Sequence, residues 1–425
     1  MKRVLVFILI CAASAFSQSQ WPSHQENVIY TFGNGDSVAD PTSGLIADSA
    51  GNLYGSAPSE VYELSPPAQP GGDWTESLIY FFQGGIGYNL GNLTLDSSGN
   101  LYGATTNGGG STNCNGGCGT VFELSPPSVV GGSWTYTALY DFQGGTTDGQ
   151  EPNGDLIFDS AGNIYGTTQA GGNQQCDFPG CGVIFELSPP SSQGEPWTES
   201  ILYLFQGGSD GSGPYAGLTL DEQGRLYGTT AFGGQSSVCK SSYGCGTVFV
   251  LRRSTHDGQN WSEKVLLRFN ANGVTGLEPL GTLTIHENAI YGTTASGSDP
   301  DGPVIFKLSL EQDAPIETVL YGSDDACSVS KSGIVFDHAG NLYGVFGSDG
   351  CEGGDGGEVY ELKKPQTQGG PWTIYYPGMP YGSWPVGGLT IVGNSLYGAT
   401  NQGGDPNCGE DGEGCGLVYS YGGQK

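Results

Sequence analysis

The sequence predicts an all-β protein, a seven-bladed β-propeller built from four-stranded antiparallel blades. The first observation is an "LYG" or "IYG" anchor that occurs seven times, beginning at Leu53, Leu101, Ile164, Leu226, Ile290, Leu342 and Leu396. The second is that four short apolar segments recur in each interval between anchors, bounded by Gly, Pro, Asn or Asp. Such segments are typical of strands. A unit of four strands repeated seven times indicates a propeller.

The four segments follow one another in a fixed order. Examples of the first to the fourth are "GLTLD" at 217–221, "NLYGATT" at 100–106, "GTVFELSPP" at 119–127 and "WTESILYLF" at 197–205. They are rich in β-branched and aromatic residues, which favour strands, and none shows the apolar period of a helix. We expect the first strand of each blade to line the central channel and the fourth to be outermost.

The connections also have a repeated chemistry. Between the first and second strands lies "DSAGN" at 48–52 or a close variant. Its Asp can accept hydrogen bonds from backbone amides, and its Gly can adopt the positive φ that a tight hairpin requires. We therefore interpret this stretch as a turn and not as a catalytic acid. Prolines that follow the third strand stop further strand pairing.

The two ends of the repeat region complement each other. Residues 26–32, "ENVIYTF", resemble a fourth strand without its first three, and the chain ends on a third strand, "GLVYSY" at 416–421. We predict that Val28–Phe32 completes the last blade and closes the ring, which removes exposed strand edges. The alternative is a linear solenoid.

The first residues have the pattern of an export signal. Lys2 and Arg3 precede an apolar run, and small residues follow at 13–17, as in a secretory signal peptide. We expect a signal peptide at 1–17, a tail at 18–25 and the propeller at 26–425. A lipid anchor on Cys11 is the alternative, which the bulky Ile10 disfavours. No later apolar run approaches the length of a membrane span.

Ten cysteines remain after Cys11, and they fall into five pairs. Zinc is the competing interpretation, but the spacing within pairs varies and no histidine lies nearby. We expect disulfides, and the pairs are Cys114/Cys118, Cys176/Cys181, Cys239/Cys245, Cys327/Cys351 and Cys408/Cys415.

The net charge of −30 arises from 13 Lys and Arg against 43 Asp and Glu. Such a surface disfavours nucleic acid and anionic lipid, and it is typical of a solubility surface. No cofactor is expected, although two acidic loops leave room for calcium, which takes six to eight oxygen ligands. The first carries Asp148, Glu151 and Asp155, and the second carries Asp405, Glu410, Asp411 and Glu413.

Long loops should gather on one face, which we call the top face. We expect the loops between second and third strands, which hold most cysteines, to lie there together with the connections between blades. Functional residues concentrate on such loops. Aromatic rings outside the strand pattern are candidates for stacking on a ligand, with loop packing as the alternative; they are Tyr88, Phe178, Tyr215, Phe232, Tyr243, Tyr381 and Trp384.

The whole unit, with its "LYGTT…GG…GTVFEL" order, resembles the GloVer-type (choice-of-anchor) tandem-repeat secreted bacterial proteins over residues 26–425. The resemblance implies an exported bacterial protein of propeller-like repeats, and it supplies no catalytic residues. Some members carry a C-terminal sorting anchor. This chain ends at "YSYGGQK", so we expect a freely secreted or periplasmic protein.

Signals of catalysis are weak. A Ser–His–Asp arrangement is disfavoured, because none of the four histidines falls in a top-face loop; they are His24, His256, His286 and His338. We therefore expect a monomeric binding or scaffold protein that recognises a carbohydrate or a protein through its top-face loops. The alternatives are a polysaccharide hydrolase or lyase with carboxylates at the channel mouth, and a structural envelope component.

Overall fold

The computed structural model describes residues 26–33, 36, 38–83, 91–129, 131–176, 179–192, 194–234, 244–254, 260–270, 276–297, 302–310, 315–323, 328–348, 356–367, 369–379, 381–408 and 413–422. Within these ranges the chain forms 29 strands and no helix. A helix that could cross a membrane is accordingly absent from this part of the chain.

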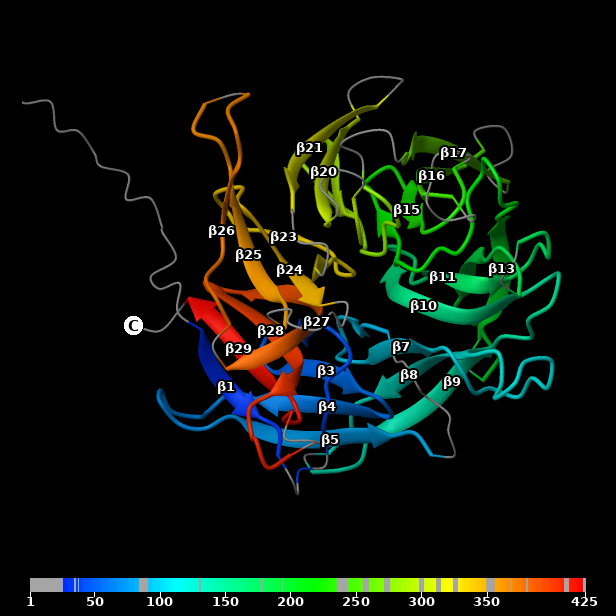
Figure 1. Ribbon diagram of the computed structural model, residues 1–425. Coiled ribbons are helices and arrows are strands. Elements are labelled where there is room, and N and C mark those ends of the chain that lie inside the picture. Colours follow the sequence, from blue (N-terminus) through cyan, green and yellow to red (C-terminus); the bar gives the residue numbers. More distant parts are fainter. Residues whose placement is uncertain are drawn as a thin grey trace, which may run out of the picture.

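The strands form seven antiparallel sheets arranged around a common centre (Figure 1). In five of the sheets, strands that follow one another in the chain are hydrogen-bonded neighbours, and the two sheets that contain β1 and β22 each depart from this at one strand. The first strand of a blade faces the first strands of other blades, so that β2 (Ile46–Ala47) lies beside β6 (Thr94–Leu95) and β27 (Gly382–Val392). The predicted seven-bladed propeller is thus confirmed, with the first strands at the centre and the fourth strands outside.

The strands of each blade run outwards from the centre in the following order. Blade 1 contains β2, β3 (Leu53–Ala57), β4 (Glu60–Ser65) and β5 (Thr75–Phe81). Blade 2 contains β6, β7 (Leu101–Thr105), β8 (Thr120–Ser125) and β9 (Thr135–Asp141). Blade 3 contains β10 (Gly149–Phe158), β11 (Ile164–Gly171), β12 (Val183–Ser188) and β13 (Thr198–Leu204). Blade 4 contains β14 (Thr219–Leu220), β15 (Leu226–Thr230), β16 (Thr247–Arg253) and β17 (Trp261–Arg268).

The second half of the ring continues the pattern. Blade 5 contains β18 (Thr284–His286), β19 (Ala289–Thr293), β20 (Val304–Ser309) and β21 (Ile316–Gly322). Blade 6 contains β23 (Val335–Phe336), β24 (Leu342–Ser348), β25 (Glu358–Lys363) and β26 (Thr373–Tyr375), and the short β22 (Ser328–Val329) also pairs with β24. Blade 7 contains β27, β28 (Ser395–Gly403), β29 (Leu417–Gly422) and β1 (Asn27–Thr31).

The ring is closed by its first strand. β1 pairs antiparallel with β29, with Asn27 opposite Ser420 and Thr31 opposite Leu417. The order of the last sheet is β1-β29-β28-β27, so β1 takes the position of the fourth strand. The predicted closure is confirmed. Because the two ends of the chain share one sheet, no blade is left with an unpaired third strand.

The turn between the first and second strands is held by its aspartate. Asp48 Oδ1 accepts hydrogen bonds from the backbone N–H groups of Ala50 (2.8 Å) and Asn52 (2.9 Å). Its Oδ2 accepts from the Asn52 side chain (2.8 Å) and from the Tyr54 hydroxyl (3.1 Å), while Gly51 has a φ of 89°. Asp96, Asp159 and Asp337 make the same four hydrogen bonds. Both oxygens are therefore used structurally, which agrees with a turn.

The glycine of each anchor makes room for an aromatic ring. A Cβ on Gly166 of β11 would lie 2.5 Å from the ring of Phe185, which comes from the neighbouring β12. The same close approach occurs in every blade, at Gly55, Gly103, Gly228, Gly292, Gly344 and Gly398. Only glycine allows the third-strand ring to lie flat over the second strand. The "LYG" anchor is thus a packing requirement.

That ring also joins neighbouring blades. Phe142 follows the outer strand of blade 2 and packs edge-to-face on Phe185 of blade 3, with ring centroids 5.1 Å apart. Four further pairs have centroid distances of 5.1–5.3 Å, namely Phe32–Tyr62, Phe82–Phe122, Phe205–Phe249 and Phe269–Phe306. All five phenylalanines that follow an outer strand are buried. Edge-to-face pairs of this kind add to the area that they bury.

Four glutamates on outer strands, among them Glu76 of β5, are partly buried, and three of them have a strongly raised pKa. Glu199 and Glu317 occupy the second position of β13 and β21, and Glu263 occupies the third position of β17. The Oε1 atom of each is buried and accepts no hydrogen bond in the described ranges. Burial raises the pKa of each carboxyl to about 7. The nearby carboxylates of Asp148 and Asp210 raise the pKa of Glu199 and of Glu263 further.

We predict that Gly166→Ala destabilises the fold by roughly 1–3 kcal/mol, because the new methyl group must displace the buried Phe185. The free energy of unfolding from chemical denaturation measures this loss. Gly110→Ala is the matched control, since a Cβ there has no neighbour closer than 3.7 Å. The loss should shrink when Phe185 is also replaced by Leu. An equal loss in both backgrounds would contradict the proposed clash.

We predict that the protein is more stable at pH 5 than at pH 8. Folding raises the pKa of Glu199, Glu263 and Glu317 from 4.5 to about 7, so the folded state binds protons that the unfolded state releases between these values. The stability from these groups is lost as the pH rises through 7. The triple Gln variant should melt higher than the native protein at pH 8, with a smaller difference between the two pH values. Glu222→Gln, at an exposed glutamate, should change neither.

Candidate functional site

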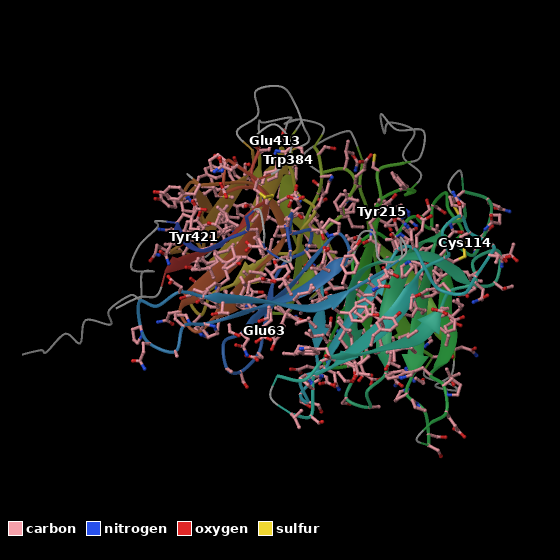
Figure 2. The ribbon with its side chains drawn as sticks, turned by 90° about the horizontal axis from the view of Figure 1, so that it is seen from below. Glu63, Cys114, Tyr215, Trp384, Glu413 and Tyr421 are labelled. Carbon is pink, nitrogen blue, oxygen red and sulfur yellow. A yellow bond between two sulfur atoms is a disulfide. The ribbon has the colours of Figure 1, made fainter. Side chains whose placement is uncertain are left out.

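A cavity of about 590 Å³ opens at the centre of the ring. All seven blades contribute to its wall, mostly through the segments that lead into their innermost strands. The lining residues used below are Asn92, Asn153, Asp155, Tyr215, Thr282, Lys331, Ser332, Trp384 and Asn401. Figure 2 shows Tyr215 and Trp384 toward the edge of the ring that lies away from Glu63. The cavity therefore opens on the top face.

Three polar side chains are linked across this cavity. Asp155 Oδ1 accepts a hydrogen bond from Asn92 Nδ2 at 2.6 Å, and its Oδ2 accepts from Thr282 Oγ1 at 2.8 Å. The chain of bonds extends at both ends, because Gly44 N–H donates to Asn92 Oδ1 (2.7 Å) and Gly217 N–H donates to Thr282 Oγ1 (3.2 Å). This network fixes the carboxylate of Asp155 in place and uses both of its oxygens.

Two aromatic side chains line the cavity from different blades, since Tyr215 precedes blade 4 and Trp384 lies in blade 7. Trp384 keeps 39% of its surface exposed. Phe232 packs edge-to-face on Tyr215 at 6.0 Å and so supports that ring from behind. Burial, together with the carboxylates of Glu151 and Glu278, raises the pKa of the Tyr215 phenol. Two carboxylates thus lie near this phenol, although neither is among the residues that line the cavity.

A repeated backbone contact holds Tyr215 and Trp384 in place. Gly213 has a φ of 61° and precedes Pro214, and its N–H donates to the carbonyl of Cys181 at 3.0 Å. Glu151, Glu278 and Asp40 make the same bond to Cys118, Cys245 and Cys415, and Trp384 makes it to Gly356. A Cβ on Gly182 would lie 2.5 Å from Pro214. Five of the seven blades are thus tied to the preceding blade by this bond.

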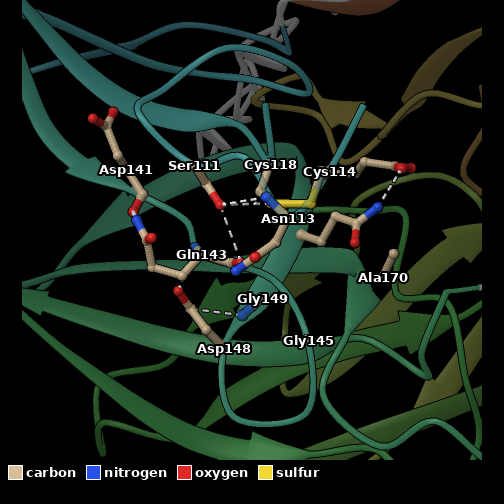
Figure 3. Close-up of a disulfide and its surroundings, with 12 residues drawn as sticks. Ser111, Asn113, Cys114, Cys118, Asp141, Gln143, Gly145, Asp148, Gly149 and Ala170 are labelled. Carbon is tan, nitrogen blue, oxygen red and sulfur yellow. Dashed lines mark hydrogen bonds between the residues drawn. A yellow bond between two sulfur atoms is a disulfide. The ribbon is translucent and has the colours of Figure 1, made fainter. Parts of the chain in front are cut away.

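Disulfides rigidify the loops that provide these carbonyl groups. Cys114–Cys118, Cys176–Cys181 and Cys408–Cys415 are bonded. Around the first of them, Asn113 Nδ2 donates to the Gln143 carbonyl at 2.9 Å, and Ser111 Oγ lies 3.4 Å from Cys118 Sγ (Figure 3). Cys245 is also disulfide-bonded. Its expected partner Cys239 lies outside the described residues, as do Cys327 and Cys351.

The remaining candidates are spread out. Tyr381 is 60% exposed and lines a separate hollow, where its N–H donates to Glu26 at 3.2 Å. Of the seven expected aromatic residues, the structure therefore brings Tyr215 and Trp384 to one cavity, with Phe232 behind Tyr215. Tyr88, Phe178 and Tyr243 lie outside the described residues.

The carboxylates of the first acidic loop, which we considered for calcium, do not come together at one point. Asp148 accepts from Tyr140 Oη (3.0 Å) and from the Gln143 N–H (2.6 Å), Glu151 accepts from Gln150 Nε2 (3.0 Å), and Asp155 belongs to the cavity network. Among the described residues no three His, Cys, Asp or Glu side chains form a group that could hold a metal ion. In the second loop, Glu410 and Asp411 lie outside the described residues.

The sequence did not direct attention to Asn92, Thr282 or Lys331. A signal for the first two exists in the repeat itself. The residue before the first apolar position of each innermost strand is glycine in four blades, at 44, 217, 333 and 388, and Asn92, Asp155 or Thr282 in the other three. A polar residue in a position that otherwise holds glycine marks where the repeat departs from its own pattern.

We predict that removing the Cys176–Cys181 disulfide with two alanines lowers the free energy of unfolding by about 2 kcal/mol, as loop-closure entropy gives for so short a loop. Denaturation of the oxidised protein measures it. The Cys114/Cys118 double variant is the control for the effect of loop closure and should lose a similar amount. Unchanged stability in both variants would show that the loops hold their shape without the bonds.

Comparison with known proteins agrees with the fold. No curated protein matches the chain. The extracellular domain of a protein assigned as a hybrid two-component system from B. thetaiotaomicron is similar, with a TM-score of 0.55 and 9% identity over 94% of this chain and 40% of that chain. PorZ, a surface component of the type-IX secretion system of Porphyromonas gingivalis, has a TM-score of 0.49 and 14% identity over 92% and 47%.

The PQQ-bound aldose sugar dehydrogenase of Streptomyces coelicolor has a TM-score of 0.43 and 12% identity, over 83% of this chain and 97% of that chain. At these identities the likeness concerns the fold alone. A family model gives more specific information, because it matches residues 57–239, from the end of β3 to the top-face loop of blade 4. Residues 57–239 thus match the model of the Gloeobacter/Verrucomicrobia repeat family.

Proposed function

We propose that this protein is an extracytoplasmic binding propeller that holds a carbohydrate in the central cavity of its top face. The observation that carries the proposal is the composition of the cavity wall, which combines two aromatic rings with amide and hydroxyl groups. Its volume of about 590 Å³ falls in the range of small-molecule sites. Disulfides persist in oxidising compartments, which supports a location outside the cytoplasm.

The aromatic rings supply the apolar part of such a site. A pyranose ring has one face of C–H groups, and tyrosine and tryptophan rings stack well against such faces while remaining wet at their edges. Trp384 is partly exposed and lies in the cavity wall with Tyr215. The backbone at Trp384, and at Gly213 two residues before Tyr215, is hydrogen-bonded to the preceding blade, so little backbone ordering is needed when a ligand binds.

The polar groups of the wall can orient a bound sugar through hydrogen bonds. Asn153, Asn401 and Ser332 line the cavity. Each asparagine offers one amide acceptor and two amide donors, and the serine offers a hydroxyl. Sugar hydroxyls both donate and accept, so this mixture suits them better than a purely charged or apolar wall would. The Asp155 network is already satisfied internally and shapes the cavity without requiring a counter-ion.

A hydrolase is less well supported than a binding protein. Glycoside hydrolysis commonly uses two carboxyl groups on either side of the scissile bond. Among the described residues that line the cavity, Asp155 is the single carboxylate, and both of its oxygens accept hydrogen bonds from neighbours. The cavity wall therefore offers no free pair of acids in the part of the chain described.

We predict that the purified protein binds glycans on an array and that Trp384→Ala and Tyr215→Ala each weaken binding of the best glycan about tenfold, the loss of one stacking contact. Calorimetry with that glycan measures the affinity. Phe81→Ala is the control, because Phe81 is 49% exposed on the outer strand β5, and it should bind as the native protein does.

Two results would overturn the proposal. One is the absence of glycan binding at any concentration tested, and the other is binding that survives both cavity substitutions. Recovery of the bound glycan intact supports a binding protein, whereas a steady release of reducing ends would replace it with the hydrolase.

A further inference from the structure

The cavity wall has few charged side chains, and they differ in whether protein groups already pair with them. Two charged side chains line it among the described residues, Asp155 and Lys331. The oxygens of Asp155 are both occupied by Asn92 and Thr282. Lys331 is exposed and forms no ion pair with any residue in the described ranges. The ammonium group of Lys331 is thus the charge that the wall leaves available to a ligand.

This lysine is unusual in its chain. The protein has 13 Lys and Arg against 43 Asp and Glu, so a basic side chain meets an acidic one easily. Several of the described basic residues do so, in the ion pairs Arg225–Asp221, Arg253–Glu186, Lys363–Glu361 and Lys364–Glu287. Lys331 instead faces the central cavity, where the side chains next to it are those of a binding site.

The position of Lys331 places the available positive charge in one part of the cavity wall. Lys331 precedes β23 of blade 6, and Trp384 belongs to the neighbouring blade 7, whereas Tyr215 precedes blade 4. The carboxylates of Glu151 and Glu278 lie close enough to Tyr215 to affect its phenol. The wall therefore presents a positive charge and an aromatic ring from the neighbouring blades 6 and 7, and a second aromatic ring from blade 4.

The large negative charge of the whole protein does not prevent an anion from binding here. Charges on the outside of the ring are screened over a Debye length of about 8 Å at physiological salt. A contact between an ammonium and a carboxylate is decided by groups within a few ångströms, where a charge-assisted hydrogen bond is stronger than a neutral one. The side chain of Lys331 therefore governs the choice of ligand charge locally.

Resting on the carbohydrate-binding function proposed above, we propose that the ligand is an acidic sugar whose carboxylate pairs with Lys331 while its ring stacks on Trp384. The ligand class is an oligosaccharide that contains uronic acid. Its neutral hydroxyl groups lie toward Tyr215 and the asparagine side chains of the wall, whose amide oxygens can accept their hydrogen bonds.

The test compares matched ligands. Trisaccharides of galacturonic acid and of glucuronic acid are titrated into the full protein by calorimetry, together with their carboxyl-reduced counterparts, which differ only by a CH₂OH group. The native protein should bind one of the acidic trisaccharides roughly tenfold more tightly than its reduced form, and this ratio should fall with added salt. Lys331→Gln should bring the ratio close to one, and Lys331→Arg should keep most of it.

Control variants separate this inference from the general function. Lys364→Gln removes the same charge from a lysine paired with Glu287 outside the cavity and should keep the full ratio. Trp384→Ala should weaken the acidic and the reduced ligands alike. A native ratio near one, or an unchanged ratio in Lys331→Gln, overturns the role of Lys331 while carbohydrate binding stands. Failure of both ligand classes to bind, when no neutral glycan binds either, overturns both proposals.

Discussion

The structure depends on an edge-to-face contact between aromatic rings of successive blades. A phenylalanine after each of five outer strands packs on the third-strand ring of the next blade, at nearly constant distances. The third-strand ring can occupy that place because the anchor glycine beside it has no side chain. Each of these blades therefore contributes a third-strand ring on one side and a phenylalanine after its outer strand on the other. In blade 7 the outer strand is β1, and Phe32, which follows it, packs on Tyr62 of blade 1.

Because the seven blades share one repeated framework, we expect functional residues at the positions where one blade differs from the others. The segments leading into the innermost strands share one path around the channel, and glycine there lets backbones approach closely, as at Gly44 and Gly388. Asn92, Asp155 and Thr282 stand where other blades have glycine, and they join into one hydrogen-bonded chain across the channel. The seven-fold scaffold thus holds a cavity whose wall is not symmetric.

Most of the fold could be predicted from local chemistry, and most of the site could not. The Asp48 turn, the seven units and the pairing of residues 28–32 with the last blade follow from motifs that recur, so each repeat supports the interpretation of the others. The cavity wall depends on residues that occur once. Tyr215 and Trp384 could be suspected from their irregular positions, but Lys331 resembles any surface lysine until the ring brings blade 6 next to blade 7.

Several backbone positions in the connections between blades are strained, although the propeller fold itself does not require a side chain at these positions. Five blades use a residue with positive φ directly before a proline, and in blade 4 this residue is Gly213. The other four positions hold Asp40, Glu151, Glu278 and Trp384, although a side chain there costs about 1 kcal/mol or more relative to glycine. Their N–H groups make the same bond that Gly213 makes, so the side chains add nothing to the backbone contact. Strain of this kind is retained at functional sites, and at Trp384 it places an aromatic side chain in the wall of the cavity to which all seven blades contribute.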